Sequence, residues 1–253
     1  MELNIKGKCA VVTGGASGLG AEISRILASE GANVAINYIV DPDTAIGLAK
    51  ELSEQYNVKC IAVKGDISKS EDVKSNVEEI IRELGAIDIL VNNAGVWPTA
   101  YVEEMTDEQW ERTIQINLNG PFYWSRNVVN HLIERGAKGK IINVVSQAAF
   151  HGSTSGHAHY AASKGGLVTF TVSLAREVAK YGINVCAVAP GMMRTPMNKD
   201  ALSEREDKYL ERIPLRRISD PVEVAYAVAF LASDKADYIT GATIDVTGGM
   251  LMR

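Results

Sequence analysis

The stretch Val11-Val12-Thr13-Gly14-Gly15-Ala16-Ser17-Gly18-Leu19-Gly20 joins an apolar run to a segment of helical period near the start of the chain. A glycine lets the chain reverse at such a turn, and neighbouring glycines let backbone N–H groups approach a bound pyrophosphate. The positive end of the following helix favours the same negative charge. Glycine-rich turns also serve as ordinary strand-to-helix connections. We predict a dinucleotide-binding turn because the loop lies between a strand and the first helix.

The rest of the chain alternates between short β-branched runs and longer segments of helical period. The runs predicted as strands are Cys9–Thr13, Asn33–Tyr38, Lys59–Lys64, Ile87–Val91, Lys140–Val145, Ile183–Ala189 and Thr243–Val246. The segments predicted as helices include Gly20–Ser29, Ser70–Leu84, Asp107–Arg135, which Pro121 should kink, and Ala158–Lys180. Such alternation is typical of βαβ units. We therefore predict an α/β chain with one domain over 1–253, a Rossmann fold whose doubly wound parallel sheet has helices on both faces.

Composition and charge exclude several classes of partner. The formal net charge is -5 and the longest basic run is Arg216-Arg217, which argues against nucleic acid and anionic membranes. No apolar stretch approaches the roughly 20 residues of a membrane span. The three cysteines fit no metal motif, and the first residues lack the blocks of a signal peptide. We expect a cytoplasmic protein that binds a small molecule and no metal.

Ligands of such sheets bind beyond the carboxyl ends of the strands. Tyr160 and Lys164 follow the fifth predicted strand and are four residues apart, so they share one helix face. A free tyrosine has a pKa of about 10 and is a poor base at neutral pH, whereas an adjacent ammonium stabilises the phenolate. A surface tyrosine beside a solvated lysine is the alternative.

Several motifs together resemble the classical short-chain dehydrogenase/reductase family, from Gly7 to Gly249. They are the glycine loop, Asn92-Asn93-Ala94-Gly95, Tyr160-Ala161-Ala162-Ser163-Lys164, and Pro190-Gly191 with Thr195. The resemblance implies an NAD(P)-dependent oxidoreductase that interconverts an alcohol and a carbonyl. A nucleotide-sensing relative without activity is the alternative from another class.

The resemblance also implies roles for individual residues. Tyr160 would transfer the proton, Ser146 would hold the substrate oxygen, Lys164 would assist the tyrosine, and Asn117 would hold a water in a relay to the lysine. Residues implied to bind the cofactor are Gly14, Ser17, Gly18, Leu19, Gly20, Tyr38, Asp66, Ile67, Asn92, Ala94, Gly95, Tyr160, Lys164, Pro190, Gly191 and Thr195.

The substrate pocket is expected from loops at approximately 96–101, 150–157 and 191–213. Candidate contacts are Trp97, His151, His157 and Met192, with Asn198 as a further hydrogen-bonding group. His151, His157 and His159 crowd the residues before Tyr160, but no acidic ligands accompany them, so a metal site is not favoured.

The substrate, the cofactor preference and the oligomeric state are predicted from fewer residues than the fold is. We expect a sugar or polyol, because two stretches resemble the aldose dehydrogenase branch of the family: Asn93-Ala94-Gly95-Val96-Trp97-Pro98, and Thr195-Pro196-Met197-Asn198-Lys199-Asp200 through Arg212-Ile213-Pro214. A 3-oxoacyl thioester reductase and a hydroxysteroid or ketone dehydrogenase are alternatives. NAD is preferred because Asp41 and Asp43 would repel a 2′-phosphate, but NADP stays possible because Tyr38 stands where NAD-preferring relatives place an aspartate. The resemblance implies a homotetramer built through Asp107–Arg135, Ala158–Lys180 and the last helix and strand.

Overall fold

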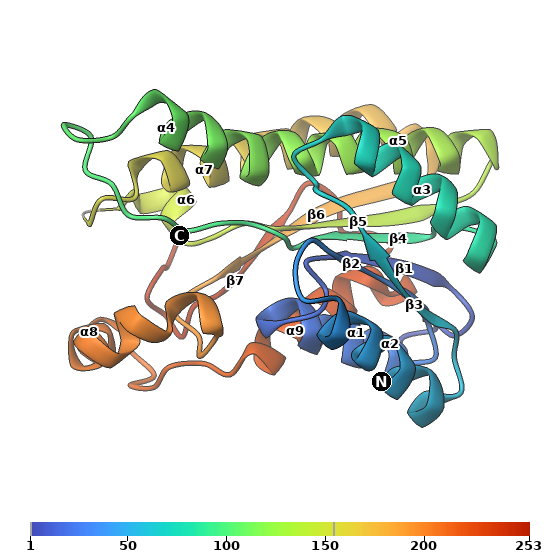
Figure 1. The fold of residues 1–253 in the computed structure, drawn as a ribbon, viewed down its shortest axis with the longest axis horizontal. Helices are drawn as coiled ribbons and strands as arrows, with labels where there is room; N and C mark the ends of the chain where they lie inside the picture. The colour runs from blue at the N-terminus through green and yellow to red at the C-terminus, as the bar shows by residue number, and fades with distance from the viewer. Residues whose placement is uncertain (1, 154) are drawn as a thin grey trace.

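Seven parallel strands form one sheet through the centre of the molecule (Figure 1). The computed structural model describes residues 2–153 and 155–253. The strands are β1 (Cys9–Thr13), β2 (Asn33–Tyr38), β3 (Cys60–Lys64), β4 (Ile89–Asn92), β5 (Gly139–Val144), β6 (Ile183–Pro190) and β7 (Thr243–Val246). Their order across the sheet is β3-β2-β1-β4-β5-β6-β7, so the strand order reverses between β1 and β4. This reversal marks the switch point at which ligands bind.

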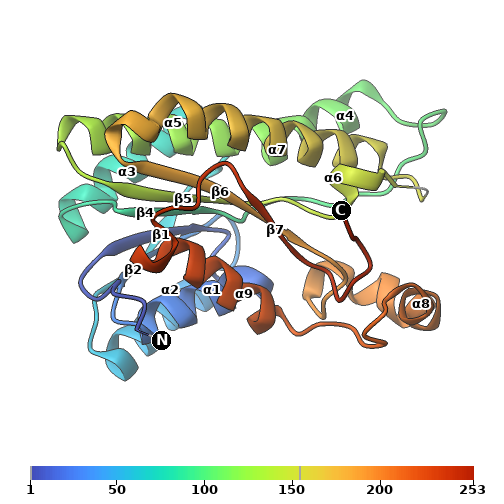
Figure 2. The same cartoon turned by 180° about the vertical axis from the view of Figure 1, so that it is seen from behind.

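Helices cover both faces of the sheet (Figures 1 and 2). On one face lie α1 (Gly18–Ser29), α2 (Pro42–Tyr56) and α9 (Pro221–Ala232); on the other lie α3 (Ser70–Leu84), α5 (Gly120–Glu134) and α7 (Ala158–Val178). The remaining α-helices are α4 (Asp107–Ile114), α6 (Ala148–His151) and α8 (Lys199–Arg212), and α8 stands apart from the sheet. The shorter 3-10 helices are η2 (Ala179–Tyr181), η3 (Pro196–Asn198) and η4 (Asp234–Ala236).

The period-2 alternation of strand side chains divides the core into two layers. In β1, Ala10 and Val12 pack with the helices of the α1 face, whereas Cys9 and Val11 pack with those of the α5 face. All four side chains are at most 2% exposed, which explains why the strand is apolar throughout. Burial on both faces fixes the register, because a slip by one residue would exchange the two layers.

The predicted fold class is confirmed, and every predicted strand is present with its ends within two residues. The single helix predicted over Asp107–Arg135 was wrong in one respect. A π-helical turn, η1 (Gln115–Asn119), separates α4 from α5, and Pro121 lies in the first turn of α5 rather than at a kink inside a helix. Pro121 has no N–H, so it withholds the bond that a carbonyl one turn earlier would accept, and the irregular turn lies there.

The predicted loop at 191–213 is also more ordered than the sequence suggested. It contains η3 and α8, and its apolar side chains Leu202 and Ile213 join Ile218 in a small core of their own. The sequence did not predict α8, because its strongly polar composition shows no clear helical pattern of apolar residues. Among residues 2–153 and 155–253, no helix combines the length and apolarity needed to cross a bilayer.

Candidate active site

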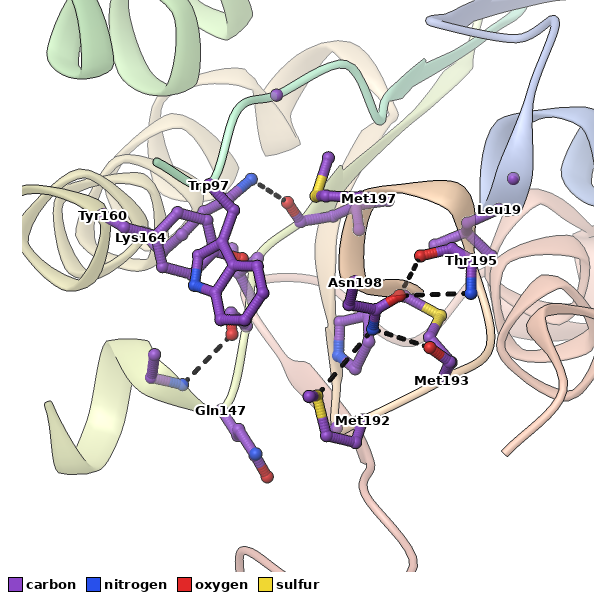
Figure 3. A pocket seen from close by; sticks show the side chains of 18 of the residues that line it. Leu19, Trp97, Gln147, Tyr160, Lys164, Met192, Met193, Thr195, Met197 and Asn198 are labelled. Carbon is purple, nitrogen blue, oxygen red and sulfur yellow. Dashed lines mark hydrogen bonds between the residues drawn. The ribbon is translucent and has the colours of Figure 1, made fainter. Parts of the chain in front are cut away.

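A cavity of about 600 Å³ lies beyond the carboxyl ends of β1, β4, β5 and β6. This volume falls in the range of roughly 300–1,000 Å³ that is usual for small-ligand and cofactor pockets. Its wall is formed by residues of 14–20, 93–97, 144–148 and 190–198, with some gaps, by residues of the expected loop at 150–157, and by residues of α7, α8 and the C-terminal segment. Figure 3 shows part of this wall.

The glycine loop has the geometry of a phosphate cradle. Gly14 and Gly18 adopt left-handed backbone angles, with φ of 60° and 50°. A Cβ atom on Gly20 would lie 2.1 Å from the carbonyl oxygen of Gly14, so no larger residue fits there. The first N–H groups of α1 have no partner within the helix, and Ser17 makes no side-chain cap bond to them. These donors and the helix dipole fit the pyrophosphate of a dinucleotide.

Thr13 and Asn93 tie this loop to the end of β4. The Thr13 hydroxyl accepts hydrogen bonds from the backbone N–H groups of Asn93 and Ala94, both at 3.0 Å. The Asn93 amide donates to the carbonyl oxygens of Thr13 and Gly14, at 3.0 and 3.3 Å. Neither side chain was singled out from the sequence. Their role depends on two loops that lie far apart in the chain.

Tyr160, Ser146 and Lys164 meet at one side of the cavity (Figure 3 labels the tyrosine and the lysine). Burial raises the pKa of Tyr160, and a hydrogen bond with Ser146 lowers it in part. Lys164 is 4% exposed, and its ammonium lies 5.9 Å from the centre of the Tyr160 ring and donates to the carbonyl oxygen of Val144 at 2.8 Å. Burial lowers the pKa of Lys164 to about 8. The tyrosine therefore keeps its proton at neutral pH, ready to give it to a carbonyl.

Asn117 lies in the π-helical turn η1 and is fully buried. Its amide nitrogen donates to the Val96 carbonyl oxygen at 2.9 Å and to the Ser163 hydroxyl at 3.1 Å, while its amide oxygen accepts from the Val96 N–H at 2.9 Å. Ser163 in turn donates to the carbonyl oxygen of Tyr160. The side chain of Asn117 thus fixes the Val96 loop against α7, and Ser163 is a supporting residue that the sequence reading missed.

The residues predicted to bind the cofactor fall into two groups. Those that line the cavity are Gly14, Ser17, Gly18, Leu19, Gly20, Ala94, Gly95, Tyr160, Lys164, Pro190, Gly191 and Thr195. Those outside its lining are Tyr38, Asp66, Ile67 and Asn92. Asn92 is buried and donates to Ser125 and Asn143, so its amide braces β4 against α5 and β5. Ile39, the neighbour of Tyr38, lines the cavity instead.

The four candidate substrate residues all line the cavity. Trp97 stacks on His157 with ring centres 4.4 Å apart, and its edge faces Tyr160 at 6.5 Å. His157 is held by the Pro98 carbonyl oxygen at 2.8 Å, and burial lowers its pKa, so the ring is neutral at pH 7. His151 is exposed and contacts the Gly152 carbonyl oxygen, while Met192 forms part of an apolar wall.

Asn198, the further expected substrate contact, also lines the cavity, but its polar atoms are bonded within the protein. Its amide oxygen accepts from the N–H and the hydroxyl of Thr195, and its nitrogen donates to the Met193 carbonyl oxygen at 2.6 Å. These bonds cap η3 and commit the side chain to the local turn. Across 2–153 and 155–253, no three His, Cys, Asp or Glu side chains cluster as metal ligands.

Lys164 gives a prediction for the protein without cofactor. Its pKa of about 8 in the fold lies below its value of 10.5 in an open chain. Between these pH values the unfolded chain binds more protons at this residue, so its contribution to the free energy of unfolding rises with pH. We compare the melting temperatures of the native protein and of Lys164→Met. Between pH 7.5 and pH 9.5 the difference, native minus variant, is expected to increase by roughly 2–6 °C, which corresponds to a change on the order of 1–2 kcal/mol in the free energy of unfolding.

The comparison with Lys164→Met is needed because other groups act in the opposite direction. Burial raises the pKa of Tyr160 and raises the pKa of Cys9 to about 12, so both lose stabilising effect as pH rises. These groups are present in both proteins and cancel in the difference. Equal melting profiles across this range would contradict the buried state of Lys164.

The arrangement is suited to proton transfer at a carbonyl or carbinol oxygen. Ser146 and Tyr160 can both donate to one oxygen, and Lys164 stabilises the phenolate that remains after the proton leaves. A nicotinamide cofactor in the cavity would supply or accept the hydride. The glycine loop would hold its pyrophosphate, and the wall around Tyr160 and Lys164 would hold its reactive end.

Comparison with known proteins gives a consistent result. The sequence model of a family described as enoyl-(acyl carrier protein) reductase matches residues 14–251. A protein of Staphylococcus epidermidis named 3-oxoacyl-[acyl-carrier-protein] reductase FabG is 40% identical over 97% of this chain and 99% of its own length. The protein of the same name from Aquifex aeolicus is 39% identical over 99% of this chain and all of its own.

Solved structures agree with the sequence comparisons. A dehydrogenase/reductase from Sinorhizobium meliloti superimposes with a TM-score of 0.91 at 33% identity, covering 99% of this chain and 98% of its own. A short-chain type dehydrogenase/reductase from Mycobacterium marinum gives a TM-score of 0.94 at 28% identity, covering 100% and 98%. With the glycine loop, the Tyr160–Lys164 pair and the sheet order already established, the chain belongs to the short-chain dehydrogenase/reductase family of oxidoreductases.

Proposed function

We propose that this protein reduces a 3-oxoacyl thioester to the 3-hydroxyacyl thioester with a reduced nicotinamide cofactor. The main support is that Ser146, Tyr160 and Lys164 line one cavity. The chain that holds them is 40% identical, over nearly its whole length, to proteins named 3-oxoacyl-[acyl-carrier-protein] reductase. Hydride adds to the 3-oxo carbon, Tyr160 gives its proton to the oxygen, and Ser146 holds that oxygen by a hydrogen bond.

The walls of the cavity suit an acyl group better than the sugar expected from the sequence. Met192, Met193 and Met250 line it with Trp97, and methionine adapts to flexible apolar ligands. Asn198, one of the groups expected to bind sugar hydroxyls, is committed to η3. The named relatives also point to a thioester rather than an aldose.

Two arginines that could guide an acidic carrier to the cavity are neutralised by ion pairs, which favours a small thioester over a docked carrier. Arg194 forms a two-point ion pair with Glu206, and Arg217 forms one with Glu223. Such pairing neutralises two of the charges, those of Arg194 and Arg217, that could attract an acidic partner. Arg212, which lines the cavity, has no ion-pair partner among the described residues.

A substrate comparison tests the proposal. We expect kcat/KM for an acetoacetyl thioester to exceed about 10⁴ M⁻¹s⁻¹, the lower end of the usual range. Aldoses, polyols and hydroxysteroids should stay below roughly 10² M⁻¹s⁻¹. The rate of NADH or NADPH consumption measures each value. An aldose or polyol oxidised faster than the thioester is reduced would restore the sugar hypothesis and reject this one.

For the cofactor we propose NAD(H) over NADP(H). Asp41 caps the N-terminus of α2 and accepts hydrogen bonds from the hydroxyl and the N–H of Thr44, which lower the pKa of its carboxyl group. Ile39 lines the cavity, and the charged carboxylate of Asp41 follows it by two residues in the chain. At this place it would repel a 2′-phosphate. We expect the native enzyme to favour NADH over NADPH by at least tenfold in kcat/KM.

Adding positive charge should reverse this preference. Ile39→Arg is expected to raise the NADPH/NADH ratio of kcat/KM about tenfold or more. Ile46→Arg is the matched control, because Ile46 is equally exposed, 55% against 54%, but lies outside the cavity lining. A native enzyme that favours NADPH tenfold, or an equal effect of both variants, would contradict the assignment.

We further propose a homotetramer located in the cytoplasm. Trp110 and Phe122 are large apolar side chains left 43% and 40% exposed on α4 and α5, and Tyr226 on α9 is 59% exposed. Burial against another copy would remove this surface from water. The cysteines Cys9, Cys60 and Cys186 are free thiols, as in proteins of reducing compartments. Light scattering at micromolar concentration should give four times the mass of one chain, and a monomer would contradict this.

A further inference from the structure

Gln147 directly follows Ser146 in the chain, and the proposed reaction gives it no role. Its side chain is 8% exposed and forms part of the cavity wall, between Ser146 and α6. Its amide oxygen has no hydrogen-bond partner among the residues that the structure describes. A buried carbonyl oxygen without a donor is destabilising, so such groups often serve a ligand.

The contact of the amide nitrogen shows which end of the group is left free. The nitrogen of Gln147 lies 3.1 Å from the Met250 sulfur. A thioether sulfur can accept a hydrogen bond but has no hydrogen to donate, so the nitrogen rather than the oxygen must face it. The oxygen is therefore the end left free. Because the contact with sulfur is weak and the terminal torsion is soft, the amide oxygen can turn toward a ligand at little cost.

The position of Gln147 indicates which part of a substrate it meets. In Figure 3 its side chain extends away from Tyr160 and Lys164. Tyr209, Arg212 and Met250 line the same cavity. The group that reaches Gln147 is thus not the reacting oxygen, which Ser146 and Tyr160 serve, but a second polar group further along the substrate.

We propose that Gln147 is a specificity-determining residue whose amide oxygen accepts a hydrogen bond from an N–H or O–H donor that the substrate carries beyond its reacting carbon. This deepens the proposed function and rests on it. In a thioester of a pantetheine-like arm, the donor is the amide N–H of the arm. In a hydroxylated ketone, the donor is a second hydroxyl. The 3-oxoacyl group itself has no such donor, so in a thioester substrate Gln147 selects the carrier portion of the molecule.

The test compares Gln147→Met with the native enzyme on two matched pairs of substrates. The first pair is the acetoacetyl thioester of N-acetylcysteamine, which has an amide N–H, and acetoacetyl ethyl thioester, which has none. The second pair is 4-hydroxy-2-butanone and 2-butanone. We expect the native enzyme to prefer the donor-bearing member of one pair and the variant to lose about tenfold of that preference. The pair that responds identifies the donor as N–H or O–H.

Met192→Leu is the matched control, because it changes the same wall without removing a polar atom. It is expected to alter kcat/KM for both members of a pair by the same factor and so leave the ratio unchanged. Ratios that are equal in the native enzyme and Gln147→Met for both pairs would overturn the proposal. Because the ratio concerns Gln147 alone, the proposed thioester activity can stand even then.

A melting experiment gives a second readout that needs no substrate. Methionine fills a similar volume and removes the unpaired oxygen, so Gln147→Met is expected to melt at the same temperature as the native protein or above it. A residue kept for ligand binding shows this pattern of lost selectivity without lost stability. A melting temperature lowered by more than about 3 °C would show that the amide supports the fold, and would overturn the proposal.

Discussion

Tyr160→Phe is expected to lower kcat by roughly 10²–10⁴-fold, the usual contribution of a general acid–base group. Phenylalanine keeps the ring and loses only the hydroxyl that donates to the substrate oxygen. Burial holds the pKa of Tyr160 above its ordinary value, so the native residue carries the proton that reduction consumes. Ser146, the other hydroxyl assigned to the substrate oxygen, is an aliphatic alcohol and a far weaker acid than a phenol, so it is not expected to replace the tyrosine as proton donor.

The measurement separates the loss of chemistry from a loss of binding. Cofactor affinity, followed by the fluorescence of the reduced nicotinamide, should change by less than about threefold, because the glycine loop is untouched. Tyr181→Phe is the matched control: Tyr181 is 43% exposed, lies in η2 after the end of α7 and should retain full activity. A Tyr160→Phe enzyme with more than a tenth of the native kcat would remove the tyrosine from its assigned role.

Local patterns in the sequence predicted the layers of the fold and most of the cavity wall. Apolar runs such as Ile89–Asn92 are buried on both faces of a parallel sheet, so their composition alone indicates strands. The spacing of Tyr160 and Lys164 follows from the helical period, and both side chains do reach the same cavity. A buried strand and the spacing of two residues on one helix both depend on residues that are close in the chain, so the sequence shows them directly.

Features that depend on distant segments could not be predicted in the same way. The free oxygen of Gln147 is recognisable only once Met250, 103 residues away, is known to contact its nitrogen. Asn93 could not be linked to the glycine loop without the pairing of β1 with β4. The π-helical turn at Gln115–Asn119 has ordinary helical composition, and Pro121 indicated an irregularity without giving its form. Tertiary contacts decided each of these cases.

Gly20→Ala tests the other half of the site, the cradle for the cofactor. The added methyl group would lie 2.1 Å from the Gly14 carbonyl oxygen and 2.7 Å from the Asn93 amide nitrogen. Both atoms must move, and Asn93 is the residue that ties the loop to Ala94 and Gly95 in the cavity wall. We expect cofactor affinity to fall by at least about 100-fold, or 2.7 kcal/mol, and the protein to lose roughly 1–3 kcal/mol of stability.

Gly47→Ala distinguishes this collision from a general effect of replacing glycine in a helix. Gly47 lies inside α2, and a Cβ atom there would have nothing within 4 Å. The same substitution should stabilise α2 by about 0.5–1 kcal/mol, because alanine loses less backbone entropy on folding, and should leave cofactor affinity unchanged. Both variants replace a glycine by an alanine, but Gly20→Ala is expected to lower the free energy of unfolding and Gly47→Ala to raise it. If Gly20→Ala bound the cofactor within threefold of the native protein, the close approach of Gly14 and Asn93 could not be what shapes the cradle.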